Sequence, residues 1–248
     1  MERKTCITTI LLLIIISFTI QANFNRRKDI YEAFVRGDMN KWMSIITEME
    51  KTPGSWTKDQ KLELTEYYYG LAAYHIGEKN YKSAKIIINK ADVILDQLLK
   101  SDPKNATILA YKGSFTAYKI SLDKIKVVVL GKESLKYLNE AYKYDPNNIQ
   151  ALTDKGHALF NAPKLFGGDK NEAIIFFLKS IALLEKNNLS SQNWFYLNNI
   201  VQAAKAYTET GQFEKAKQLY LKLLQKEPNF GWVKNELYPE LLKTMGNR

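Results

Sequence analysis

The chain has 248 residues, and 46 % of them are hydrophobic, enough for a sizeable core in one or two units. Glycine and proline are sparse, at 12 and 6 residues, which favours long helices over an all-β fold. The formal net charge is +10, but the excess is lysine spread along the chain, which argues for a solvated surface and against a nucleic-acid partner. Attraction to an anionic envelope surface is the functional alternative.

Residues 1–22 have the pattern of a secretory signal peptide. Arg3 and Lys4 precede an unbroken aliphatic run, Ile10 to Ile16, and Ala22 offers a small residue for cleavage. The apolar stretch is shorter than the roughly 20 residues that a membrane-spanning helix requires. We therefore expect cleavage near Ala22, a periplasmic or secreted product and no stable membrane span after cleavage, with an uncleaved anchor as the alternative.

The only cysteine, Cys6, lies before the apolar run, whereas a lipoprotein cysteine follows such a run. Removal of residues 1–22 leaves a chain that excludes disulfides, cysteine-ligated zinc and thiol catalysis. An exported protein without disulfides fits a bacterial periplasm better than a eukaryotic secreted domain.

A repeat of about 41–43 residues organises the rest of the chain. The prolines that close helices, Pro103, Pro146 and Pro228, are 43 and 82 residues apart, and 82 is close to twice the repeat length. We predict helical hairpins at about 26–53, 62–103, 106–146, 149–187 and 194–228, followed by a capping helix at 232–245.

The first predicted hairpin turns at Gly37, and the basic run Arg26-Arg27-Lys28 before it is interpreted as a solvated helix start. In the second hairpin Gly77 ends the first helix, and apolar residues recur with a 3.6-residue period from Tyr81 to Leu98. In the third, the apolar run 127–130 is expected to be a helix extension or a packed loop.

An insertion, Asn161 to Gly168, separates the two helices of the fourth hairpin. A glycine pair before a helix can bind anions, but Asp169 at the N-cap position and Glu172 three residues later predict a structural capping arrangement instead. Leu165 and Phe166 are expected to fold over the binding groove or its edge.

The most complete repeat is Asn199 to Asn229. Ala216 and Tyr220, with Pro228 eight residues later, fit the second half of the tetratricopeptide (TPR) signature, and Ala203-Ala204-x2-Tyr207 fits the first half. The chain resembles the TPR family over nearly all of the predicted mature sequence. The resemblance implies an all-α fold, a right-handed TPR-like α-solenoid of about five hairpins plus a C-terminal capping helix.

A narrower resemblance rests on Gly156, the segment Asn161-Ala-Pro through Phe-Gly-Gly-Asp169, and Ala173. This block is similar to exported TPR proteins of Bacteroidetes-type bacteria with no assigned role. It is also similar to the TPR accessory component of TRAP-type solute transporters, which implies a lipoprotein with a ligand pore. The chain lacks the lipoprotein cysteine of that component.

In TPR stacks the first helix of each hairpin lines the concave face. A helical-wheel argument predicts a mixed, lightly charged and aromatic set there, which suits peptide or small-ligand recognition. For the two histidines, the alternative is an ordinary, partly exposed position on a helix. The predicted concave-face residues are Tyr68, His75, Ser114, Tyr118, Thr153, His157, Phe160, Asn161 and Lys205.

No G-x-S-x-G, H-E-x-x-H or Walker motif is present, so no catalytic residue is predicted. We also predict no metal site and no cofactor. The resulting expectation is an exported, non-catalytic scaffold that binds a protein or peptide partner in the cell envelope through its concave face. The alternative is a periplasmic solute-binding accessory subunit of a transporter, with a small ligand held among Tyr68, Tyr118 and Phe160.

Overall fold

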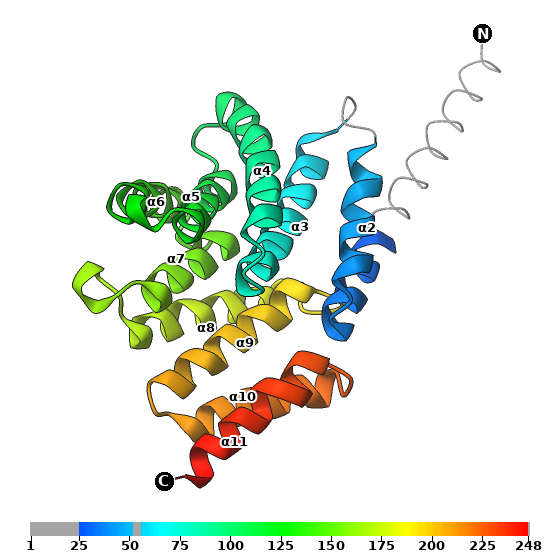
Figure 1. Ribbon diagram of the computed structural model, residues 1–248, viewed down its shortest axis with the longest axis vertical. Helices are drawn as coiled ribbons and strands as arrows, with labels where there is room; N and C mark the ends of the chain where they lie inside the picture. The colour runs from blue at the N-terminus through cyan, green and yellow to red at the C-terminus, as the bar shows by residue number, and fades with distance from the viewer. Residues whose placement is uncertain (1–24, 52–55, 248) are drawn as a thin grey trace, which may run out of the picture.

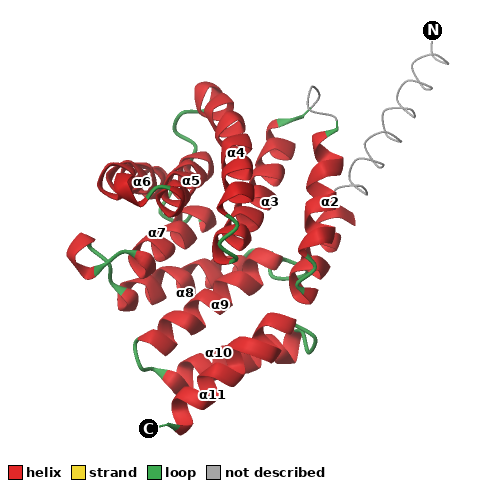
Figure 2. Ribbon diagram, in the orientation of Figure 1, coloured by secondary structure: helices red, strands yellow, loops and turns green. Residues whose placement is uncertain are grey.

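The computed structural model describes residues 25–51 and 56–247. The predicted signal peptide, residues 1–22, lies outside these residues. Every regular element within the described ranges is a helix (Figures 1 and 2). The helices are residues 25–36, α2 (Met39–Glu50), α3 (Lys58–Gly77), α4 (Tyr81–Ser101), α5 (Ala106–Leu122), α6 (Val127–Tyr144), α7 (Ile149–Asn161), α8 (Lys170–Lys186), α9 (Trp194–Glu209), α10 (Phe213–Lys226) and α11 (Tyr238–Gly246).

The helices pack as consecutive pairs, α3 with α4, α5 with α6, α7 with α8 and α9 with α10. Each second helix also packs against the first helix of the next pair, so the hairpins stack in chain order. Gly37, predicted to turn the first hairpin, and Gly211 in the turn of the last hairpin both have a left-handed backbone, with φ of 70° and 74°. The stack is therefore continuous from the second hairpin to the last.

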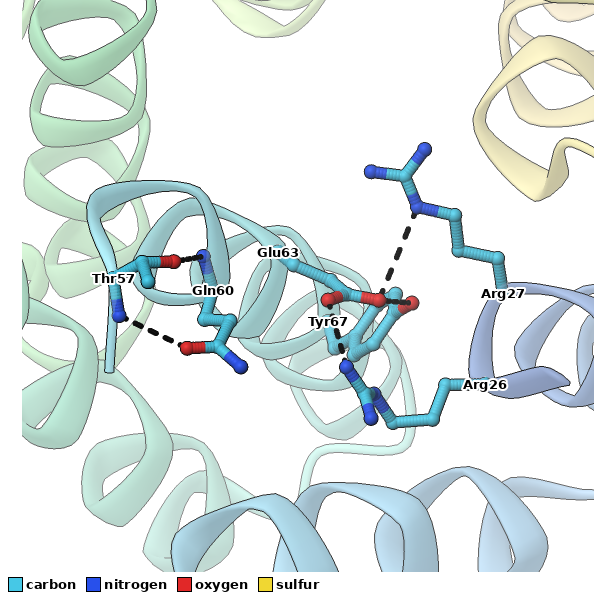
Figure 3. A network of polar contacts seen from close by, with 6 residues as sticks. All are labelled: Arg26, Arg27, Thr57, Gln60, Glu63 and Tyr67. Atoms are coloured by element: carbon cyan, nitrogen blue, oxygen red, sulfur yellow. Dashed lines mark hydrogen bonds and ion pairs between the residues drawn. The ribbon is translucent and has the colours of Figure 1, made fainter. Parts of the chain in front are cut away.

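Polar caps set the helix starts. α3 begins at Lys58, before the predicted start at residue 62, because Thr57 and Gln60 form a reciprocal capping box (Figure 3). Asn105, Asn148 and Asn193 cap α5, α7 and α9 by accepting hydrogen bonds from backbone amides. The first helices of the hairpins thus start at short polar side chains that the sequence supplies at each turn.

Small residues allow close approach within the hairpins. A Cβ added at Gly113 would lie 2.8 Å from Leu138 of α6, and one at Gly156 would lie 2.7 Å from the Phe177 ring of α8. The alanine at the equivalent contact of the last hairpin, Ala204, is fully buried. Size at these positions therefore limits the distance between paired helices.

The apolar run 127–130 and the insertion 161–168 both contain helical structure. The run 127–130 opens α6, as the helix-extension interpretation predicted, and a short 3₁₀ turn, η2 (Lys124–Lys126), precedes it. The insertion before α8 contains a second 3₁₀ turn, η3 (Lys164–Phe166), and Asp169 caps α8. Leu165 is 89 % exposed, so the expectation that it covers a groove is wrong.

The C-terminal helix contains a π-helical segment, η4 (Val233–Leu237), and continues as α11. Pro239 follows this segment and cannot donate a backbone hydrogen bond, which the wider π turn accommodates. None of the helices in the described ranges has the length and apolarity required to span a membrane.

Candidate functional site

The start of α9 packs against the N-terminal hairpin and α3, far from it in sequence (Figure 1). The Trp194 ring lies against Phe34 and Trp42, with centroids 5.6 and 4.9 Å away. Its Nε1 donates a hydrogen bond to Glu66 Oε1 over 2.7 Å. A Cβ at Gly70 would lie 2.7 Å from the Trp42 ring and 3.1 Å from Trp194. The helices therefore curl until the last repeat meets the first, and the inner side of the curl is enclosed.

A buried carboxylate ties the N-terminal helix to α3 (Figure 3). Glu63 is 6 % exposed and accepts hydrogen bonds from Arg26 Nη2 at 3.3 Å and from the Tyr67 hydroxyl at 2.7 Å. Arg27 Nε lies 3.9 Å from the same carboxylate. A buried charge requires a paired partner. The interpretation of this basic run as a solvated helix start is thus wrong for Arg26.

The adjoining sides of α3, α5, α7 and α9, here called the inner face, hold buried polar side chains. Asp154 of α7 is 1 % exposed, and its carboxylate accepts hydrogen bonds from the Tyr69 hydroxyl and Gln150 Nε2, both at 2.8 Å. Burial raises the pKa of Asp154 to about 7, against the opposing effect of hydrogen bonds from Gln150, Tyr69 and Ser114. This carboxyl group binds α3, α5 and α7 together.

A second buried group joins α7, α8 and α9. The Thr153 hydroxyl donates to Asn199 Oδ1 over 2.8 Å and lies 2.9 Å from Ser180 Oγ. All three residues are fully buried. Because their polar atoms satisfy one another, this part of the inner face is a packed interior.

A cavity of about 500 Å³ opens where the first helices begin. α5, α7 and α9 each present their first residues to it, and the loops before α7 and α9 form its walls. The lining is rich in amide, hydroxyl and charged side chains. The lining residues are Arg27, Glu66, Tyr67, Thr107, Asp145, Asn147, Asn148, Ile149, Gln150, Leu184, Asn188, Leu189, Ser191, Gln192, Asn193, Trp194 and Phe195.

The loop between α8 and α9 has an unusual backbone at this cavity. Asn188 and Gln192 both adopt left-handed conformations, with φ of 57° and 46°. Such conformations in residues other than glycine persist only where the surrounding structure fixes them, and they concentrate at binding sites. The Asn193 cap and its bond from Nδ2 to the Leu189 carbonyl, 2.7 Å long, hold the loop in place.

Charge in the cavity comes from Arg27, Glu66 and Asp145. Burial raises the pKa of Glu66 to about 7, while Arg27 and the Trp194 N–H oppose the shift. The cavity therefore offers a guanidinium group, two carboxyl groups, of which that of Glu66 has a pKa near neutral pH, and several amides. These groups can bind a polar ligand through hydrogen bonds and charge. Within the described chain, no cluster of three His, Cys, Asp or Glu side chains is arranged to hold a metal ion.

Four of the predicted concave-face residues are buried. Thr153 belongs to the α7–α9 contact, and Ser114 hydrogen-bonds Asp154. Tyr68 points to the N-terminal hairpin, where its hydroxyl donates to Glu50. Phe160 lies beneath the Lys170 ammonium, 5.7 Å from the ring centroid. These four side chains are at most 9 % exposed, so they stabilise the stack rather than present an open surface.

The other predicted residues are partly or fully accessible. Tyr118 stacks on Tyr69 at 5.5 Å, and Asn161 Nδ2 donates to the His157 carbonyl over 2.8 Å. Lys205 lies over the Trp232 ring at 5.9 Å.

The two histidines, His75 on α3 and His157 on α7, differ in their surroundings. His157 packs edge-on to Phe177, and burial, followed by nearby Lys205, lowers its pKa to about 4. His75 lies beside the Tyr74 ring at 5.5 Å, and burial lowers its pKa as well. Desolvation thus favours the neutral imidazole at both positions.

The sequence argument missed Asp154, Glu66 and Trp194. One signal was available in the run Tyr67-Tyr68-Tyr69. Consecutive residues of an α-helix point about 100° apart, so three large side chains in succession require cover on most sides of α3. All three tyrosines are at most 3 % exposed. The wheel argument assumed an open concave side, which α3 does not have.

Comparisons with known proteins agree with this architecture. Residues 198–230 match the tetratricopeptide repeat family. The crystal structure of TTC0263, a thermophilic TPR protein of Thermus thermophilus, matches with a TM-score of 0.51 at 15 % identity, covering 84 % of this chain and 92 % of that chain. Neither match is to an enzyme family, and a comparison with curated proteins found no significant match. The predicted all-α, TPR-like fold is confirmed.

Proposed function

We propose that the protein is an exported, non-catalytic scaffold that binds a protein or peptide partner at the polar cavity. The observation that carries the proposal is the amide-rich lining at the starts of α5, α7 and α9. Asn and Gln side chains both donate and accept hydrogen bonds, so they match the alternating N–H and C=O groups of an extended peptide. Asn147, Asn188 and Gln192 are exposed there.

Export rests on the sequence. The aliphatic run Ile10 to Ile16 behind Arg3 and Lys4 has the pattern of a secretory leader, and no cysteine follows it. Binding without catalysis rests on the chemistry of the cavity, which combines amides, one guanidinium group and two carboxyl groups but offers no nucleophile activated by a neighbouring base.

A second candidate is a small polar ligand, as in a solute-binding accessory subunit of a transporter. The cavity volume of about 500 Å³ lies in the usual range for small-ligand sites. Arg27 and Glu66 would bind the opposite charges of a zwitterion. This location replaces the one expected among Tyr68, Tyr118 and Phe160, because Tyr68 and Phe160 are buried and Tyr118 is stacked on Tyr69.

The test is capture of partners from cell-envelope extract on immobilised protein. Ser191→Trp places a large ring in the cavity, and Ser44→Trp adds the same ring at an exposed position on α2. We expect the unmodified protein and Ser44→Trp to recover the same partner, and Ser191→Trp to recover at least about tenfold less.

Equal recovery by both tryptophan variants would exclude the cavity. Native mass spectrometry of the eluted protein separates the two candidates. A bound small mass that Ser191→Trp loses, without a recovered protein, favours the solute-binding function.

A further inference from the structure

Two turns at one edge of the stack expose large apolar side chains. Ile125 in η2 is 95 % exposed and Leu165 in η3 is 89 % exposed, the highest values among the large hydrophobic residues of the described chain. Phe166 beside Leu165 is 54 % exposed. The start of α6 adds Val128 and Val129, at 51 % and 69 %. These five residues are here called the apolar rim.

Parallel packing of α5 and α7 brings the two turns to the same edge. Asn148 at the start of α7 donates to Thr107 at the start of α5 over 2.9 Å, and Ser114 hydrogen-bonds Asp154 further along. From Thr107 to Leu122 and from Asn148 to Asn161 the helices rise about 22 and 20 Å. The turns that follow therefore emerge at similar heights on the edge opposite the cavity.

Lysines flank the apolar rim. Lys124 and Lys126 in the first turn are exposed, as are Lys132 and Glu133 in α6. The carboxylate of Asp123 is engaged by the Ile125 amide and by Lys126 at 3.3 Å. In the second turn Lys164 is exposed. Lys170 follows and pairs with Glu209, while Asp169 is occupied as the cap of α8. Lysines thus outnumber exposed carboxylates at the first turn, whereas at the second turn the exposed Lys164 is matched by the exposed Glu172 of α8.

We infer that the apolar rim docks on the surface of a bilayer that contains anionic phospholipid. Interfacial binding combines apolar side chains that enter the headgroup boundary with lysines that contact anionic headgroups. Ile125 and Leu165 protrude singly from separate turns, which suits insertion between lipids. The cores of protein interfaces, in contrast, are depleted of lysine. Docking by this edge leaves the cavity at the opposite edge free for its partner.

The test uses the full chain and vesicles of phosphatidylcholine with and without phosphatidylglycerol. Ile125→Ser combined with Leu165→Ser removes the two protruding side chains. Ile86→Ser combined with Val93→Ser removes two apolar side chains of α4 that are 51 % and 59 % exposed. All proteins keep the same N-terminal residues, so any binding by the apolar run at 10–16 is constant, and circular dichroism checks that the helix content is retained.

We expect sedimentation with the anionic vesicles for the unmodified chain and for the α4 control. The rim variant loses at least about tenfold in partition coefficient. In a Cys6→Ser background, a polarity-sensitive dye on Leu165→Cys shifts its emission to the blue on anionic vesicles, whereas the same dye on Val93→Cys does not.

Four results would overturn the inference. The unmodified chain does not bind anionic vesicles, or it binds vesicles without phosphatidylglycerol equally well. The rim variant binds like the control, or the dye at position 165 stays in a water-like environment while the protein sediments. A rim variant that instead changes the molar mass in light scattering, with vesicle binding retained, assigns the rim to a contact between copies of the chain.

Discussion

The inner face and the apolar rim depart from the usual burial of residues in opposite directions. On the inner face Asp154, Thr153 and Asn199 are polar and at most 1 % exposed. On the rim Ile125 and Leu165 are apolar and almost fully exposed. The buried polar groups satisfy one another and fix the relative positions of helices, whereas the exposed apolar groups contribute little to the fold. Polarity alone therefore does not identify a binding surface in this chain. What identifies one is whether a side chain already has its hydrogen-bond or packing partners within the fold.

We expect the largest effect from a substitution that breaks the contact between α9 and the N-terminal hairpin, which encloses the inner face. Trp194→Ala removes a buried ring from between Phe34 and Trp42 and leaves Glu66 without its hydrogen-bond donor. We expect the free energy of unfolding to fall by about 3–5 kcal/mol, measured by urea denaturation.

Trp194→Phe is the matched variant, because it keeps an aromatic ring and removes only the donor and part of the volume. Its loss is expected to be about 1–3 kcal/mol. If Trp194→Ala unfolds at the same urea concentration as the unmodified chain, contact between the last and first repeats contributes nothing to stability.

The pH dependence of stability tests the protonation of two carboxyl groups, Asp154 on the inner face and Glu66 at the cavity. The pKa of Asp154 and that of Glu66 are both raised to about 7 by burial, so between about pH 4 and pH 7 the folded chain holds protons that the unfolded chain releases. Stability from these groups is present below pH 4 and is lost as the pH rises through 7. Asp154→Asn should reduce that decline by roughly 2–4 kcal/mol, and Glu66→Gln should act in the same direction.

Urea denaturation at several pH values from 4.5 to 8 measures this dependence. A decline that is unchanged in Asp154→Asn would show that the carboxyl group does not hold its proton in the folded chain. A rise in stability across the same window would contradict the sign for both carboxyl groups.

A pair of glycines sharpens the comparison between enclosed and open parts of α3. Gly70→Ala places a methyl group 2.7 Å from the Trp42 ring and is expected to destabilise the chain by about 1–3 kcal/mol. Gly77→Ala, at the end of the same helix, meets no atom within 4 Å and should be neutral or stabilise by about 0.5–1 kcal/mol. Thermal unfolding of both variants measures the difference. Equal midpoints would mean that α3 is not confined at Gly70.

Local sequence features predicted the hairpins well, because their causes are local. Gly37 and Gly211 turn the chain where a left-handed backbone is needed, and Gly113 and Gly156 permit close helix pairs. The return of α9 to the N-terminal hairpin could not be predicted in this way. It depends on curvature summed over several hairpins, and the Trp194–Glu66 bond joins residues 128 positions apart.

The candidate site depended on that curvature. The wheel argument placed contact residues along the middle of the first helices, where Thr153 and Ser114 are enclosed by neighbouring helices. The cavity lies instead at the starts of these helices, among loop residues such as Ser191 and Gln192 that carry no periodic pattern. The apolar rim was visible in the sequence as two short apolar segments, but their exposure required the fold.

Hydrogen exchange with and without the captured partner tests the central claim most directly. We predict that the partner slows exchange at residues 145–150 and 188–195, which form the cavity walls, and leaves the turns at 123–130 and 163–168 unchanged. Slower exchange confined to those turns, with the cavity walls unaffected, would contradict the account.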